Sequence, residues 1–315
     1  IFPDRFYQSG VCDCAEKLRP YWVHESRDEL PVYLPNEHGE MLNNDFFGGN
    51  LNGIREKLPY LHGLGVEILY LNPIFMAFST HRYDTYDYKR IDPMLGTKED
   101  FSALCSEAHA LGMKVAAHVE SPEGVRVALE NGVDSIEHGA QPDAAITALY
   151  KEKGAFQVAT LSPALPYARF DRSVSHATYE QQENGKVVFD GIIAMARENL
   201  ANGIPVGLGT DTGCPYITHY DMWRELCYFV KYCGVTPAFA LHTATLLNAR
   251  LAGIDGETGS IEAGKAADLI VCAKDPLADL SALRTLSMVI KDGYRVEHPA
   301  PKKLPEVERE LDKFL

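Results

Sequence analysis

KVAAH (residues 114–118) is the first of three short apolar runs that each lead to a side chain able to bind a metal ion. The second is VDSIEHG (133–139), which carries His138, and the third is PVGLGTD (205–211), which ends in Asp211. Such runs are typical of buried parallel strands, and α/β barrels carry their chemistry at the C-terminal ends of these strands. We therefore expect an α/β fold in which His118, His138 and Asp211 converge at one barrel mouth.

The residue types at these positions favour a hydrolytic metal site. Neutral imidazole suits zinc and similar divalent ions, and an aspartate can bind the ion or take a proton from the attacking water. A structural interpretation is also open. A single histidine at a strand end is often a hydrogen-bonded rim residue, and Asp211 within GTDTG would fit an ordinary turn.

Five motifs from about residue 110 onward share one family pattern. They are AHVES with His118, SIEHG with His138, GLGTD with Asp211, HTATLLNARLAGI (242–254) and GSIEAGKAADLIVCAKDPLADL (259–280). This part of the chain resembles the metal-dependent amidohydrolase superfamily, particularly its imidazolonepropionase-like and prolidase-like members.

That resemblance implies a role for each matching residue. His118 and His138 would be metal ligands at the ends of the fifth and sixth barrel strands, and Asp211, at the end of the eighth, would be both a ligand and the catalytic residue. It also implies a divalent metal cofactor, with zinc expected, and a small amide or peptide-like substrate cleaved at a C–N bond. The superfamily's HxH pair and carboxylated lysine are missing from this chain, which predicts an impaired ligand set.

The first 105 residues carry the motifs of another family. These are IFPDRF (1–6), DFFGGNLNGIREKLPYLHGLGVEILYLNPIF (45–75) and THRYDTYDYKRIDPMLGTKEDF (80–101). They resemble the α-amylase superfamily, in particular neopullulanase-like and cyclomaltodextrinase-like glycoside hydrolases. The resemblance implies that His81, Tyr83 and Asp84 bind substrate, although a tyrosine cluster can equally cover a core. Retaining glycosidases need two flanking carboxyl groups, and the segment that would supply them is replaced here by amidohydrolase-like sequence.

We interpret the chain as a chimera of two barrel fragments joined within residues 100–115, whether by engineering, gene rearrangement or an assembly artefact. Residues 1–110 form the amylase-like β/α segment and residues 111–255 the amidohydrolase-like one. Residues 256–300 form a small β unit, and residues 301–315 form a tail helix. We expect helices at 51–64, 122–131, 143–153, 188–201, 220–232 and 236–251, and a substrate-covering loop at 162–186.

Hydrophobic periodicity gives six barrel strands, at residues 1–6, 66–71, 113–118, 133–137, 156–161 and 206–210. A closed barrel of this type has eight, and closure depends on strand number. We therefore predict a TIM-barrel-like fold that is incomplete or distorted, that is completed in a homo-oligomer, or that has two further strands within residues 7–44 or 75–100.

Composition and net charge limit the classes of binding partner that we expect. The chain has 315 residues, of which 46% are hydrophobic, so it can bury a large core, and its net charge of -14 argues against nucleic acid or an anionic membrane surface. Seven scattered cysteines fit neither a disulfide framework nor a zinc ribbon, and we expect a cytoplasmic protein. We rank a metal-dependent amidohydrolase first, a catalytically inert chimera second and an α-glucan hydrolase third.

Overall fold

The computed structural model describes all of residues 1–315 and divides them into two compact units. Unit 1 comprises Ile1–Glu137 and Ala148–Ala155, and unit 2 comprises His138–Thr147 and Phe156–Leu315. The elements before residue 156 are α1 (Pro3–Phe6), β1 (Trp22–Val23), β2 (Asp45–Phe46), α2 (Leu51–Glu56), α3 (Leu58–Gly63), β3 (Ile68–Leu71), β4 (Phe75–Ala77), β5 (Thr85–Ile91), α4 (Lys98–Ala110), β6 (Lys114–Val119), α5 (Pro122–Glu130), β7 (Ser135–His138) and α6 (Ala144–Lys153).

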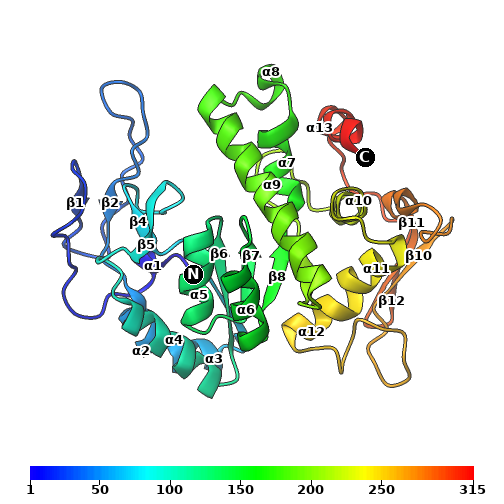
Figure 1. Ribbon diagram of the computed structural model, residues 1–315, viewed down its shortest axis with the longest axis horizontal. Coiled ribbons are helices and arrows are strands. Elements are labelled where there is room, and N and C mark those ends of the chain that lie inside the picture. Colours follow the sequence, from blue (N-terminus) through cyan, green and yellow to red (C-terminus); the bar gives the residue numbers. More distant parts are fainter. The chain divides into compact units, whose positions relative to one another are not determined.

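The second part of the chain is mainly helical and is shown in green to red in Figure 1. Its elements are β8 (Phe156–Ala159), α7 (Leu161–Arg169), α8 (Arg172–Ser175), α9 (Tyr179–Ala201), β9 (Val206–Leu208), α10 (Met222–Cys233), α11 (Pro237–His242), the π-helical turn η1 (Thr243–Leu247), α12 (Asn248–Ala252), β10 (Leu269–Cys272), η2 (Leu280–Arg284), β11 (Leu286–Lys291), β12 (Tyr294–Glu297), α13 (Pro305–Leu311) and η3 (Asp312–Phe314).

The main sheet has five strands in the order β3-β6-β7-β8-β9, and it is open. Residues Ile68 to Leu71 pair in parallel with Lys114 to Ala117, and Gln157 to Ala159 pair in parallel with Val206 to Leu208. Five of the six predicted strands are therefore present with slightly shifted ends. The incomplete barrel that the sequence predicted is confirmed.

The sixth predicted strand, residues 1–6, is wrong. Residues Pro3–Phe6 form helix α1, which begins with a proline in its first turn, where the missing N–H costs nothing and the fixed φ suits a helix. Only Ile1 behaves as a strand residue. Its amine donates to the Tyr70 carbonyl at 2.5 Å, and its own carbonyl accepts from the Asn72 N–H at 3.1 Å.

The predicted helix at 51–64 is present as two helices, α2 and α3. Asn50 caps the first by accepting a hydrogen bond from the Gly53 N–H, and Pro59 in the first turn of α3 accounts for the break at Lys57. A Thr97–Asp100 capping box starts α4, which lies beside α2 in Figure 1. Five leucine and isoleucine residues at three- and four-residue spacing predict this helical segment. Leu51, Ile54, Leu58 and Leu61 are buried, whereas Leu64 is exposed.

The predicted substrate-covering loop at 162–186 is also wrong, because these residues form helices α7 and α8 and the start of α9. A Thr178–Gln181 capping box begins α9, and α7 packs along it (Figure 1). The prolines and aromatic residues of this stretch suggest a loop, yet Leu165 and Phe170 are buried in the core of unit 2. Tertiary packing therefore overrides the local signal.

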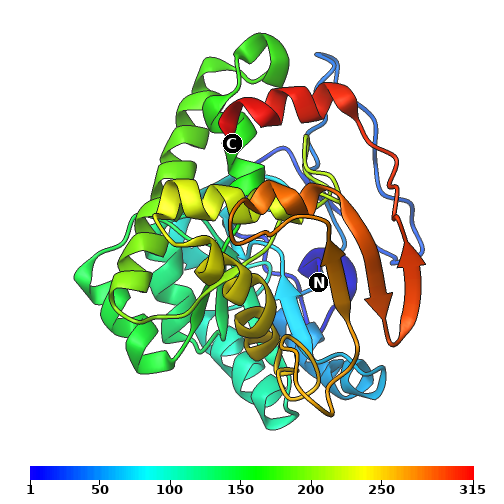
Figure 2. The ribbon, with the colours of Figure 1, turned by 90° about the vertical axis from the view of Figure 1, so that its right-hand side faces the viewer.

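The C-terminal elements follow the sequence more closely. Thr236 caps α11, which has Pro237 in its first turn, and α12 ends at Gly253 with φ +78°. Strands β10, β11 and β12 form the predicted small β unit as an antiparallel sheet, drawn in brown and orange in Figure 2. Arg224, which is buried, holds the tail through the Asp312 carboxylate at 2.5 Å. None of the helices combines the length and the apolar character that crossing a membrane requires.

The side chain of Asn248 covers the edge of β9 that does not pair with β8. Its Oδ1 accepts from the Leu208 N–H at 3.0 Å, and its Nδ2 donates to the Leu208 carbonyl at 2.8 Å. These are the two bonds that a further strand would make to Leu208. One carboxamide thus supplies hydrogen-bond partners to the Leu208 N–H and carbonyl at the edge of the strand that leads to Asp211.

Replacement of Asn248 should therefore destabilise the fold. We expect Asn248→Ala to lower the free energy of unfolding by about 1–3 kcal/mol, because two buried backbone groups lose their partner. Urea denaturation measures this loss. Asn131→Ala is the matched control, since that amide donates only to the Val127 carbonyl in its own helix. Equal stabilities of the two variants would contradict the edge-covering role.

Candidate metal site

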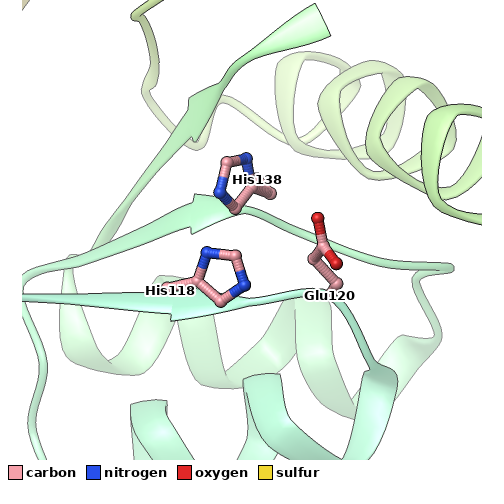
Figure 3. Close-up of side chains that lie close together, drawn as sticks. All are labelled: His118, Glu120 and His138. Atoms are coloured by element: carbon pink, nitrogen blue, oxygen red, sulfur yellow. The ribbon is translucent and has the colours of Figure 1, made fainter. Parts of the chain in front are cut away.

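Two histidines and a glutamate meet at the C-terminal ends of β6 and β7. His118 lies in β6, Glu120 follows that strand directly, and His138 is the last residue of β7. One ligand atom from each residue lies within 4.8 Å of the others, and Figure 3 shows the three side chains together. Residues two apart on a strand point to the same side, which explains why His118 and Glu120 face the same region.

The geometry and donor types of this group fit a divalent metal. Two atoms that are each about 2.1 Å from a single ion lie at most roughly 4.2 Å apart, so only small side-chain rotations are needed. Two imidazoles and one carboxylate are ligands typical of zinc, and three protein ligands leave a position for water or substrate. His118 and Glu120 are half-buried and His138 is buried, which limits competition from solvent.

The backbone at His138 is held in an uncommon conformation. Its φ is +72°, in the left-handed region, and the following Gly139 has φ +107°. A Cβ on Gly139 would lie 2.8 Å from the Met195 sulfur and 2.9 Å from Gln157 Nε2, so only glycine fits. Gln157 Nε2 donates to the His138 carbonyl at 2.8 Å, and Asn199 Nδ2 donates to Gln157 Oε1 at 3.0 Å. This network fixes the end of β7.

The imidazole of His138 is kept in the form that binds metals. Burial lowers its pKa to about 4, although the negative charge of Asp211 acts in the opposite direction. The ring is therefore neutral at physiological pH, as metal coordination requires. Its Nδ1 hydrogen-bonds to the hydroxyl of Thr160, so Nε2 is the nitrogen that can coordinate.

Asp211 lies apart from the group of His118, Glu120 and His138. It is exposed, follows the end of β9 and has φ +51°, and its Oδ2 accepts a hydrogen bond from the Cys214 thiol at 3.4 Å. Its carboxylate nevertheless acts electrostatically on His138. Left-handed backbone at a non-glycine residue is enriched at functional sites, and both Asp211 and His138 have it.

The amylase-like hairpin reaches this region through Tyr83. Its ring meets the His118 ring edge-on, with centroids 4.9 Å apart, and its hydroxyl lies 3.5 Å from Asn72 Nδ2. The His81 ring is 5.7 Å from that of Tyr83. Asp84, in contrast, accepts hydrogen bonds from the Ser79 N–H and hydroxyl, which place it in the turn between β4 and β5.

Sequence reasoning missed Glu120 as a candidate ligand. HVE at residues 118–120 has the spacing of an HxH pair, with a carboxylate in place of the second imidazole. Because residues two apart on a strand face the same side, this spacing could have identified Glu120. Thr160 had no such signal, because its contact with His138 arises only in the folded chain.

Comparison with known proteins assigns most of the chain to one family. Residues 89–296, about two thirds of the chain, match the amidohydrolase family. The chain belongs to that family. Residues 1–119 match the alpha amylase catalytic domain, and the two matches overlap in a range that contains the predicted join at 100–115.

Solved structures of amidohydrolases share the fold. A protein from Bifidobacterium longum designated a prolidase is 35% identical, with a TM-score of 0.74 over 89% of this chain and 68% of that one. A Xaa-Pro dipeptidase with bound methionine is 28% identical, with a TM-score of 0.65 over 79% of this chain and 59% of its own. Ochratoxinase from A. niger, at 23% identity and a TM-score of 0.65, supports the fold alone.

The curated relatives match the amylase-like part. Amylopullulanase from Thermoanaerobacterium saccharolyticum is 47% identical over 127 residues, which cover 36% of this chain and 10% of that enzyme. An intracellular maltogenic amylase from Bacillus subtilis is 56% identical over 115 residues, which cover 36% of this chain and 17% of that enzyme. The chain thus spans a small fraction of the length of these enzymes.

Removal of the Glu120 carboxylate should weaken metal binding. We expect the wild-type chain to bind one Zn²⁺ and Glu120→Gln to bind it about 10- to 100-fold more weakly, by analogy with other losses around metal sites. Titration against a chromophoric chelator gives the affinity. Glu123→Gln, three residues further along, is the control and should bind like the wild type. Identical affinities of Glu120→Gln and wild type would remove Glu120 from the site.

Proposed function

We propose that this chain is a metal-dependent hydrolase that cleaves a C–N bond in a small amide or peptide-like substrate. The observation that carries the proposal is the convergence of His118, Glu120 and His138 within 4.8 Å. Membership of the amidohydrolase family and the likeness to a protein designated a prolidase support it. We further propose zinc as the metal, because imidazole and carboxylate ligands suit it.

Each residue has a defined task in this proposal. A divalent ion at the site would polarise the substrate carbonyl and make water more acidic. His138, which is neutral, and His118 would donate nitrogen lone pairs, and Glu120 would supply a carboxylate oxygen whose negative charge partly balances that of the ion. Asp211, exposed and electrostatically in reach of His138, takes the proton of the attacking water or adds a further ligand.

Asp211→Asn tests this assignment. We expect kcat for Xaa-Pro dipeptides or N-acyl amides to fall by about 10²- to 10⁴-fold, which is the usual contribution of a general base. Zinc content measured on the same samples separates the two roles, since loss of a ligand lowers it and loss of a base does not. Asp190→Asn, on the exposed face of α9, serves as control. Unchanged kcat in Asp211→Asn would exclude both roles.

We also propose that His81 and Tyr83 contact the substrate beside His118. His81 Nδ1 accepts the Tyr83 backbone N–H at 3.1 Å, so the ring proton lies on Nε2 and the ring presents a donor. Burial lowers the pKa of His81, which keeps that donor neutral. The Tyr83 ring is half exposed and offers an apolar face. Asp84 contributes by holding the turn through Ser79.

A change at Tyr83 should therefore affect binding more than chemistry. We expect Tyr83→Ala to raise KM several-fold with a smaller change in kcat, because it removes contact area that ground state and transition state share. Steady-state kinetics on the same amide substrates measures both constants. Tyr86→Ala, from the same hairpin, is the matched control, since Tyr86 lies near Asp87 and Arg90. A KM effect equal in both variants would count against the proposal.

A further inference from the structure

Helix α7 begins in an unusual way. Its N-cap residue is Thr160, a type that normally bonds its side-chain oxygen to an amide of its own first turn. Here Thr160 makes no such bond, and its hydroxyl contacts His138 Nδ1 instead. Thr160 is buried, so its hydroxyl needs a partner within the protein. The side chain is thus used for His138 and not for its own helix.

The capping role falls to Glu225 of α10. Its Oε1 accepts from the Leu161 N–H at 2.7 Å, and its Oε2 accepts from the Ser162 N–H at 2.8 Å and the Ser162 hydroxyl at 2.5 Å. Leu161 and Ser162 are the first two residues of α7, where the helix leaves N–H groups unpaired and its dipole favours a negative charge.

Glu225 has no access to solvent, and its burial must be compensated. Burial raises the pKa of its carboxyl to about 7, while the three hydrogen bonds favour the ionised form. A buried carboxyl of this kind is costly for a protein that could cap α7 with Thr160 itself. Because Glu225 caps α7, the Thr160 hydroxyl is available to form a hydrogen bond with His138 Nδ1.

We propose that Glu225 is a positioning residue for the metal site: by capping α7 in place of Thr160, it directs the Thr160 hydroxyl to His138 Nδ1. The Nδ1–H then donates to Thr160, and Nε2 keeps its lone pair for the metal. Partners of this kind orient metal-binding histidines and fix their tautomer in many proteins. The inference rests on the proposed function only for its effect on metal binding, since the tautomer exists without metal.

The first test uses Co²⁺ alone as a probe of the purified full chain. Glu225→Gln turns one acceptor into a donor, so an amide of α7 loses its partner and Thr160 turns back to cap the helix. We expect Co²⁺ affinity to fall about 10- to 100-fold, the usual effect of removing a hydrogen-bond partner that orients a metal ligand. Thr160→Val should cause a similar loss and Thr160→Ser should bind like the wild type. The double variant Glu225→Gln/Thr160→Val should be no weaker than Thr160→Val, because both act through one hydroxyl.

A matched control separates positioning from stability. Asp221→Asn alters another buried carboxylate near the start of α10, one that accepts from the Thr218 hydroxyl at 2.8 Å and has no contact with Thr160. It should lower the unfolding temperature and leave Co²⁺ affinity unchanged. If Asp221→Asn weakens Co²⁺ as much as Glu225→Gln does, the effect is general destabilisation and the proposal is overturned.

The second test needs no metal. ¹⁵N NMR of the imidazoles in metal-free protein reports which nitrogen of His138 carries the proton. We expect the Nδ1–H form in the wild type and in Thr160→Ser, and a shift toward the Nε2–H form in Glu225→Gln and Thr160→Val. Failure of the wild type to bind Co²⁺ would reject the proposed function and leave this result standing. An Nε2–H tautomer in the wild type, or one unchanged in Glu225→Gln, would reject the role of Glu225.

Discussion

Three lone-pair donors converge at the C-terminal ends of β6 and β7. Ligand atoms of His118, Glu120 and His138 lie within 4.8 Å of one another, an arrangement that a divalent cation among them would stabilise. The surroundings resist relaxation of that cluster. Gln157 and Asn199 hold the backbone at His138, and Gly139 permits the close approach that a side chain would block.

The amylase-like part of the chain contacts the candidate metal site through Tyr83. The ring of Tyr83 packs edge-on against His118, so a residue of the amylase-like part borders a candidate metal ligand in the range where the two family matches overlap. Both residues belong to unit 1, and the two family matches overlap around the strand that carries His118. We propose that a join there keeps helix α4 and strand β6 whole, which would leave no break in the local sequence pattern.

Sequence patterns predicted the elements whose signals are local. Apolar runs located five strands of the main sheet, and the helix predicted from residue 236 begins there, capped by Thr236. Two predictions failed for physical reasons. Pro3 begins a helix where a strand was expected. The proline-rich sequence of α7 resembles a loop, and the residue that caps this helix, Glu225, lies 63 to 64 residues away along the chain, where no local pattern reveals it. Of the candidate site, the two histidines carried a visible signal, whereas Thr160 and Glu225 acquire their roles only through folding.

X-ray diffraction from zinc-soaked crystals, with data on both sides of the zinc absorption edge, would locate the metal. We expect one anomalous peak bonded to nitrogens of His118 and His138 at about 2.0–2.1 Å and to a Glu120 oxygen at about 2.0–2.2 Å. The nitrogen from His138 should be Nε2, with Nδ1 still on Thr160. A peak elsewhere, or none at these three side chains in zinc-saturated crystals, would show that they do not form a metal site.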